Sequence, residues 1–178
     1  TPEMVTKIRE GLAFLRQRAE YYADIATSEQ TFLDRASGVG VVSGETCVQL
    51  GAVGPVLRAS GVAFDVRRTF PYLQYDKVEF PVRTSELCDV LGRTLVRVQE
   101  VIDACDICTQ CLDMMPEGDV NVRFPRKVPE GEAVARVEAQ RGEVIYYVRS
   151  NGTDVPERVK IRTPTLANLP ASLEMVKG

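Results

Sequence analysis

Histidine and tryptophan are both absent from the 178-residue sequence. At a usual frequency of roughly 2%, about four histidines would be expected in a chain of this length. Their absence excludes sites that need an imidazole as base or ligand: Ser-His-Asp and Cys-His nucleophilic centres, H-E-x-x-H zinc sites and Cys2His2 zinc fingers. The glycine-rich motifs G-x-x-x-x-G-K-[ST] and G-x-G-x-x-G are missing too, which removes two common nucleotide-binding designs.

Long apolar runs are also lacking, since the longest fall far short of the ~20 residues that a membrane span needs. No signal peptide is recognised, because Thr1-Pro2-Glu3 leads directly into a charged amphipathic pattern. The net charge of −3 gives no overall attraction to nucleic acid. With 44% hydrophobic and 26% charged residues, the chain is expected to fold as a single domain over residues 1–178. Because it starts without Met and ends at Lys177-Gly178, we expect an excised part of a larger protein.

Five cysteines, an odd number with three of them crowded together, favour a reducing compartment over a disulfide framework. The crowded ones, Cys105, Cys108 and Cys111, have a spacing that allows an iron–sulfur cluster with Cys47 or Cys88 as fourth ligand. A regular helix would instead spread the three thiols over an arc of about 120°, so that they do not converge on one metal. Cys105 and Cys108 also fall on an apolar stripe, which favours packing in the core.

Two segments have the apolar periodicity of long helices. The first covers about residues 2–30, where Thr1 is a suitable cap and Pro2 suits the first turn. Its predicted stripe is Ile8, Leu12, Leu15, Ala19, Tyr22 and Ala26. The second covers about residues 85–115 and ends at Pro116. Its predicted stripe is Leu87, Leu91, Leu95, Val98, Ile102, Cys105, Cys108 and Leu112.

Shorter elements are predicted between and after these helices. Ser43 is a suitable cap for a short helix that ends at Gly51, and Pro55 for the start of another that ends near Gly61. The last third is rich in Val, Ile and Tyr, and its strands are predicted at residues 133–138, 143–149 and 157–163. We therefore expect an α+β fold, with a predominantly helical core and a small antiparallel C-terminal sheet.

Two sets of charged residues are candidates for a site. Arg58, Asp65 and Arg67 are charges among apolar and glycine-rich neighbours, and if buried they must be paired. Glycines in this region allow a close approach of two backbones, or of a backbone and a cofactor. Arg141 lies in a predicted turn between two strands, from which it can aim a fixed positive charge at an anion or metal site. The alternatives are a structural ion-pair network for the first set and an exposed hairpin arginine for the second.

Taken together, four stretches resemble one superfamily: GVGVVS, LGAVGPVLRASGVAFDVRRTFPYLQYD, VEAQRGEVIYYVRSNGTDVPERVKIRTPTLANL and the closing MVKG. The chain resembles the large subunit of membrane-bound energy-converting nickel–iron hydrogenases, and equally the 49 kDa subunit family of respiratory complex I, NADH:quinone oxidoreductase. The resemblance runs from about residue 28 to residue 178, with the motifs in the same order. It implies a helical core with a small β region.

The resemblance also implies roles for individual residues. Arg141 falls where the hydrogenases place an arginine over the nickel–iron pair. Pro164 and Thr165 match a Pro-Ser/Thr pair that contacts the iron's diatomic ligands. Arg58, Asp65 and Arg67 would shape the wall of this cavity or pair across it.

Cofactors and partners follow from the same resemblance. The two C-x-x-C pairs that hold nickel and iron in hydrogenases match nothing in this chain, so no cofactor is expected in the fragment itself. The parent protein would use a nickel–iron centre or a quinone, and the isolated fragment would be inactive. The implied partners are a small iron–sulfur subunit and membrane subunits, on the cytoplasmic side of the cell membrane. A non-catalytic relative that acts as a scaffold for the iron–sulfur subunit is the alternative.

Overall fold

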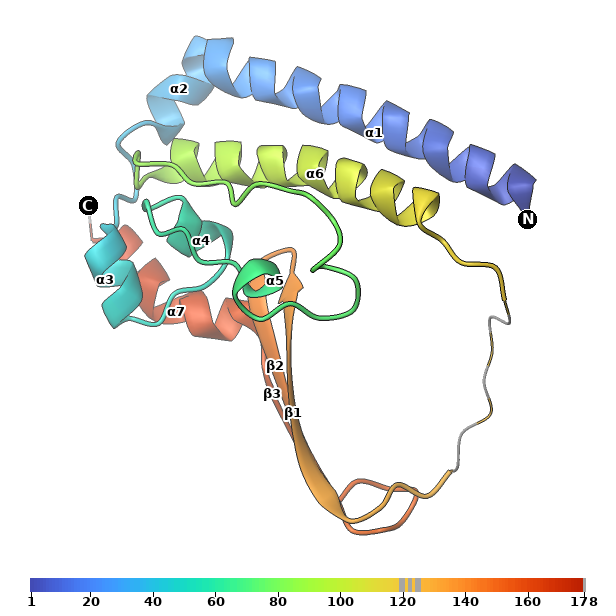
Figure 1. The fold of residues 1–178 in the computed structure, drawn as a ribbon. Helices are drawn as coiled ribbons and strands as arrows, with labels where there is room; N and C mark the ends of the chain where they lie inside the picture. The colour runs from blue at the N-terminus through green and yellow to red at the C-terminus, as the bar shows by residue number, and fades with distance from the viewer. Residues whose placement is uncertain (119–120, 122, 124–125, 178) are drawn as a thin grey trace.

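The computed structural model describes residues 1–118, 121, 123 and 126–177. In chain order, its elements are α1 (Pro2–Ser28), α2 (Gln30–Ala36), α3 (Gly44–Gln49), α4 (Pro55–Arg58), α5 (Val66–Thr69), α6 (Val90–Asp113), β1 (Gly131–Ala139), β2 (Gly142–Ser150), β3 (Arg158–Arg162) and α7 (Pro164–Met175). The long helices α1 and α6 lie side by side, and the sheet extends away from the helical body (Figure 1). This is the α+β architecture that the sequence predicts.

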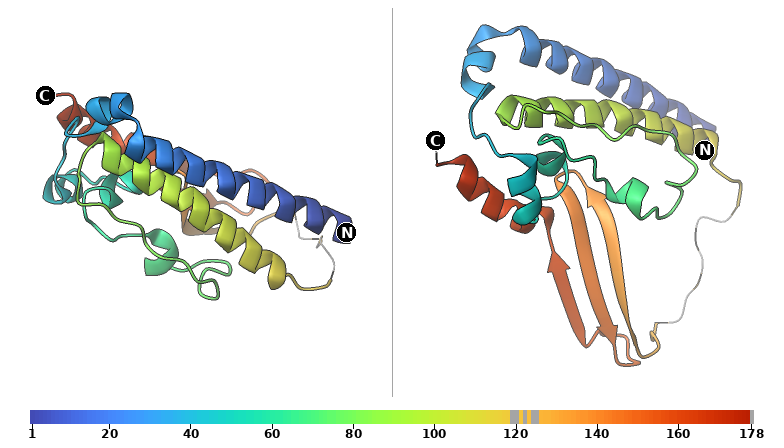
Figure 2. Two further views of the ribbon diagram at one scale, coloured as in Figure 1. Left: turned by 90° about the horizontal axis from the view of Figure 1, so that it is seen from above. Right: turned by 60° about the vertical axis from the view of Figure 1, so that its left-hand side comes forward.

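Helices α1 and α6 are antiparallel, and side-chain ion pairs as well as apolar contacts join them. Arg9, near the start of α1, binds Asp113 at the end of α6 at 2.5 Å, and Arg16 binds Asp106. Figure 2 shows the two helices alongside each other from a second direction. Arginines thus occupy part of the face of α1 that meets α6.

The predicted stripe of α1 is only partly correct. Ala19 and Ala26 are buried, but Ile8, Leu15 and Tyr22 are 43%, 47% and 52% exposed. The physical reason is that the arginines on α1 turn toward the aspartates of α6, so the inward face is rotated from the most apolar one. Small alanines on that face permit the close approach.

The predicted single helix over 2–30 is wrong at its end. Glu29 has an extended backbone, with φ −78° and ψ 111°, and it is at once the C-cap of α1 and the N-cap of α2. The chain therefore changes direction there, and α2 continues at an angle to α1 (Figure 1). Neither glycine nor proline marks this break in the sequence.

The second long helix is shorter than the predicted 85–115. It starts at Val90 because Asp89 is its N-cap, with the side chain accepting a hydrogen bond from Gly92 N at 2.8 Å. The other carboxylate oxygen of Asp89 accepts from Gly38 N at 2.7 Å, which ties the glycine-rich loop to α6. Leu87 lies before the helix and is exposed, so its place on the predicted stripe is wrong.

The glycine-rich region forms the short helices that the sequence predicts. The Ser43 hydroxyl caps α3 by accepting from Thr46 N, and α4 begins at Pro55. These helices pack on α7, which the sequence analysis did not anticipate. The shared apolar core consists of Val42, Cys47, Ala52, Val56, Leu57 and Ala171.

The sheet has the order β1-β2-β3, and both pairs are antiparallel. Pairing of Ala139 with Gly142 leaves Gln140 and Arg141 as a two-residue turn. One end of the sheet, which carries this turn, lies against the helical body, and the strands project from it (Figure 2). Within the described residues, no helix is both long and apolar enough to cross a membrane.

Candidate functional site at the turn between β1 and β2

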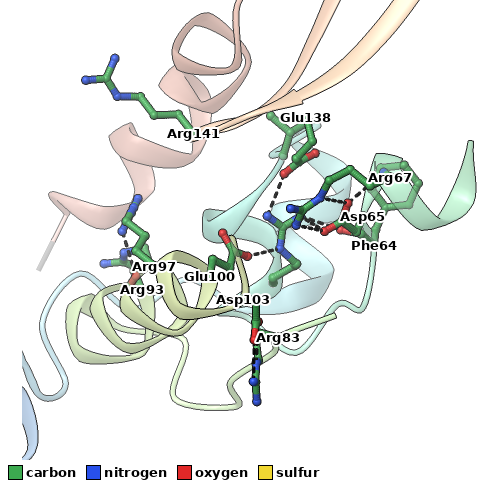
Figure 3. Close-up of polar contacts among 12 residues, drawn as sticks. Phe64, Asp65, Arg67, Arg83, Arg93, Arg97, Glu100, Asp103, Glu138 and Arg141 are labelled. Carbon is green, nitrogen blue, oxygen red and sulfur yellow. Dashed lines mark hydrogen bonds and ion pairs between the residues drawn. The ribbon is translucent and has the colours of Figure 1, made fainter. Parts of the chain in front are cut away.

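Arg58 is the centre of a buried ion-pair network. Its side chain is 1% exposed and reaches α6, β1 and the loop before α5. The guanidinium donates to Glu100 Oε1 of α6 at 2.7 Å, to Glu138 Oε1 of β1 at 2.7 Å, and to the Phe64 carbonyl at 3.0 Å (Figure 3). Because three of its donors are satisfied in different directions, Arg58 joins α4, α6 and β1.

Asp65 and Arg67 extend this network. Asp65 caps α5 by accepting from Arg67 N at 2.9 Å, and the Arg67 guanidinium donates to both its oxygens, at 3.0 and 2.6 Å. Arg58 lies 3.6 Å from the same carboxylate. Burial acts to raise the pKa of Asp65, but the hydrogen bonds and charge of Arg67, with the charge of Arg58, lower it overall.

Glu138 behaves in the opposite way. Its side chain is 6% exposed, and burial raises its pKa although Arg58 opposes the shift. Asp65 adds to the rise because it is a second negative charge close by. The network contains two arginines, Arg58 and Arg67, against three carboxylates, so one carboxylate is less well compensated than the others.

The structure therefore confirms a structural ion-pair network for Arg58, Asp65 and Arg67. Their side chains are 1%, 0% and 13% exposed, and those of Asp65 and Arg67 point toward each other (Figure 3). Sequence analysis did not assign Glu100 or Glu138 to the network. Glu138 stands three residues before Arg141 in the sequence, but only the fold shows that it meets Arg58.

Two glycines allow the turn between β1 and β2 to pack closely against the glycine-rich region. A Cβ atom on Gly54 would lie 2.2 Å from the Gly142 Cα and 2.7 Å from the Arg141 carbonyl oxygen, and Gly54 has a φ of +66°. A Cβ atom on Gly142 would lie 2.8 Å from the Gly54 Cα. The close approach anticipated from the sequence is thus between two backbones, and it places the turn against the start of α4.

Asn168 of α7 lies beneath the same turn. Its Oδ1 accepts from Val53 N at 2.8 Å, and its Nδ2 donates to Val53 O at 3.2 Å and to Arg141 O at 3.4 Å. Sequence analysis missed this residue because it missed α7. The Thr163-Pro164 pair, a cap followed by proline at the first helical position, is the signal that would have located the helix.

Arg141 itself is exposed, and its side chain extends away from the Arg58 network (Figure 3). In the described part of the chain, its guanidinium makes no hydrogen bond or ion pair. The sheet register pairs Arg162 with Ile145, so β3 ends at the same end of the sheet as the turn. Pro164 and Thr165 begin α7 one residue later, after Thr163; Pro164 is buried and Thr165 is exposed.

Among the described residues, no three Cys, Asp or Glu side chains come close enough to share a metal ion. Cys105, Cys108 and Cys111 lie on the continuous helix α6, as predicted, and Cys105 is buried. Cys108 and Cys111 are exposed, so the core position predicted for Cys108 is wrong. The donor set of a nickel–iron centre is therefore not assembled by these residues.

Comparison with known proteins decides the family. The family model described as "Respiratory-chain NADH dehydrogenase, 49 Kd subunit" matches residues 1–128 and 120–178, which together span the whole chain. The chain belongs to this 49 kDa subunit family.

Relatives of this 49 kDa family member include two kinds of oxidoreductase. The chain is 45% identical to the carbon monoxide-induced hydrogenase of Rhodospirillum rubrum over 148 residues, which is 83% of this chain and 41% of the relative. It is 39% identical to an NADH-quinone oxidoreductase subunit of Opitutus terrae over 173 residues, 96% of this chain and 43% of the relative. The chain thus spans less than half the length of these two relatives.

A solved structure shows the same fold. The membrane-bound sulfane sulfur reductase, an archaeal respiratory membrane complex, contains a chain that matches with a TM-score of 0.83 and 33% sequence identity. The match covers 98% of this chain and 53% of the other. The sequence and the fold therefore both support membership of the 49 kDa family, which the residue motifs also indicate.

Proposed function

We propose that this chain forms one wall of the catalytic cavity of a membrane-associated oxidoreductase complex, in which electrons from an iron–sulfur chain reach protons or a quinone. The observation that carries the proposal is Arg141, an exposed arginine on a turn held against the start of α4 and against α7. Membership of the chain in the 49 kDa subunit family supports its assignment to an oxidoreductase complex. An arginine with no partner in the described residues is available for an external ligand.

In this proposal, Arg141 directs its positive charge at the electron acceptor. With a quinone as acceptor, a fixed cation stabilises the negative charge that develops on the quinone during reduction, because the protein does not reorganise at that moment. Pro164 and Thr165 border the same end of the sheet, and the exposed Thr165 hydroxyl is a hydrogen-bond donor available to the acceptor. The buried ion-pair network of Arg58, Asp65 and Arg67 supports this wall of the cavity from the interior of the protein.

The five cysteines of this chain do not form a nickel–iron ligand set among the described residues. No step through such a centre is therefore assigned to these residues. For the same reason, we expect residues 1–178 alone to show no hydrogen uptake with a dye as acceptor. The contribution of the chain is positioning and electrostatics.

Two acceptors are supported by specific comparisons. Protons are favoured by the 45% identity to a carbon monoxide-induced hydrogenase. A quinone is favoured by the family model and by the relatives named as NADH-quinone oxidoreductase subunits. Both alternatives include a small iron–sulfur subunit as electron donor and membrane subunits as neighbours, on the cytoplasmic face of the cell membrane.

The experiment is turnover by the complete complex, purified anaerobically from membranes with this chain in place. Reduced methyl viologen serves as electron donor, and either hydrogen formation or consumption of decylubiquinone is followed. The proposal predicts turnover with one of the two acceptors. A complex that contains the chain and an intact iron–sulfur subunit yet reduces neither acceptor would favour the scaffold alternative.

A further inference from the structure

Asn168 connects three segments that are remote in the sequence. Its side chain is buried on α7 and uses both ends of its amide. The Oδ1 atom accepts from Val53 N, and Nδ2 donates to the carbonyls of Val53 and Arg141. The residue therefore binds the loop before α4 and the turn of the sheet at the same time.

The hydrogen bond from Asn168 holds the backbone of Arg141 and not its side chain. The guanidinium is exposed and makes no hydrogen bond within the described residues, whereas the carbonyl oxygen is held at 3.4 Å from Asn168 Nδ2. The Gly54–Gly142 contact limits how closely the turn approaches α4. Together, the hydrogen bond and the contact set the place from which the arginine side chain extends.

We infer that Asn168 is a positioning residue for Arg141: it fixes the turn so that the guanidinium meets the electron acceptor in one place. This inference rests on the proposed function of Arg141. Loss of the Asn168 side chain leaves the turn free to shift relative to α7, and a displacement of about 1 Å at a reacting group costs up to about 100-fold in rate. The charge of Arg141 would remain, but in the wrong position.

The test is a double-mutant cycle in the complete complex, with Asn168→Ala and Arg141→Ala made singly and together. Turnover is measured with reduced methyl viologen as donor and with the acceptor that the wild-type complex reduces. We expect Asn168→Ala to lower kcat about tenfold when Arg141 is present. It should cause no further loss on the residual rate of the Arg141→Ala complex, because nothing is left to position.

An equal loss in both backgrounds, or no loss in either, would overturn the inference. If Arg141→Ala leaves kcat unchanged, the role of Arg141 in the proposed function fails, and this is a different outcome from additivity. Asn168→Asp is the second variant in case Asn168→Ala does not assemble, since it keeps the acceptor for Val53 N and loses the donor to both Val53 O and Arg141 O. Asn151→Ala, in the exposed loop after β2, is the control and should retain wild-type kcat.

Discussion

Arg58 and Glu138 lie 80 positions apart in the sequence, yet a 2.7 Å hydrogen bond joins the guanidinium of one to the carboxylate of the other. Both side chains are buried. This pair fixes the end of β1 to α4, three residues before the arginine at the turn. The site therefore depends on a contact between the first and the last third of the chain.

Replacement of Arg58 should destabilise the protein strongly. Arg58→Lys keeps the charge but has no planar fork to bind Glu100, Glu138 and the Phe64 carbonyl together. Arg58→Met in addition leaves buried carboxylates without compensation, and breaking a buried pair in this way costs about 3–5 kcal/mol. Urea denaturation followed by circular dichroism should give the order wild type, Lys, Met in decreasing free energy of unfolding. Equal stability of the wild type and the Met variant would show that the network is not structural.

Gly54 and Gly51 form a matched pair for testing the backbone contact. Both have positive φ, +66° and +67°, but a Cβ atom on Gly51 meets nothing within 4 Å, whereas one on Gly54 overlaps Gly142. Gly51→Ala should cost about 1–2 kcal/mol, from backbone strain alone. Gly54→Ala should cost at least about 1–3 kcal/mol more, because the turn must move and because Gly54, with φ +66° and ψ −144°, has a backbone conformation essentially confined to glycine. Equal losses in the free energy of unfolding would contradict the observed contact.

The stability should depend on pH with opposite signs at Asp65 and Glu138. The lowered pKa of Asp65, caused by Arg67 and Arg58 against the effect of burial, gives stability that is present above the unfolded value of about 3.9 and lost as pH falls through the folded value. The raised pKa of Glu138, caused by burial, gives a contribution present below about 4.3 and lost as pH rises through the folded value.

Unfolding free energies between pH 3 and pH 7 check this for the wild type, Asp65→Asn and Glu138→Gln. The advantage of the wild type over Asp65→Asn should grow with rising pH, and its advantage over Glu138→Gln should shrink. Slopes of the same sign for the two variants would be incompatible with the geometry of the network.

Four of the five thiols should separate into two classes of reactivity. Cys108 and Cys111 are exposed on α6, whereas Cys47 and Cys105 are buried, and burial raises the pKa of both buried thiols. Titration of the native protein with a coloured thiol reagent should modify Cys108 and Cys111 rapidly and the two buried cysteines only on unfolding.

Anaerobically purified protein should contain less than one iron per chain and lack iron–sulfur absorption. A stoichiometric cluster would require α6 to unwind around these cysteines.

Much of the fold follows from local signals in the sequence. The two long helices, the Ser43 cap, the start of α4 at Pro55 and the three strands are all predicted, because each depends on residues close together in the chain. The break at Glu29 is not, since no glycine or proline marks it. The inward face of α1 is misassigned because Arg9 and Arg16 reach their partners on α6, and periodicity does not foresee an ion pair between helices.

For the site, too, the sequence shows local signals but not the contacts between distant segments. The glycines around Arg58, Gly54 among them, signal a close approach, but the sequence does not say that the partner is Gly142. Asn168 has no recognisable pattern of its own, because its role depends on partners 27 and 115 positions away. What the sequence motifs supply is the family, and what the fold supplies is the support behind Arg141.

In the proposed function Arg141 faces the electron acceptor, and kcat of the complete complex with Arg141→Met tests this. Methionine removes the positive charge and the hydrogen-bond donors, whereas Arg141→Lys keeps the charge without the planar geometry of arginine. The control is Arg149→Met, half-exposed on β2, which should retain wild-type turnover. We expect kcat to fall about 100-fold for Arg141→Met, with normal assembly of the complex, and to fall less for Arg141→Lys. An assembled Arg141→Met complex with wild-type kcat would show that Arg141 does not act on the acceptor.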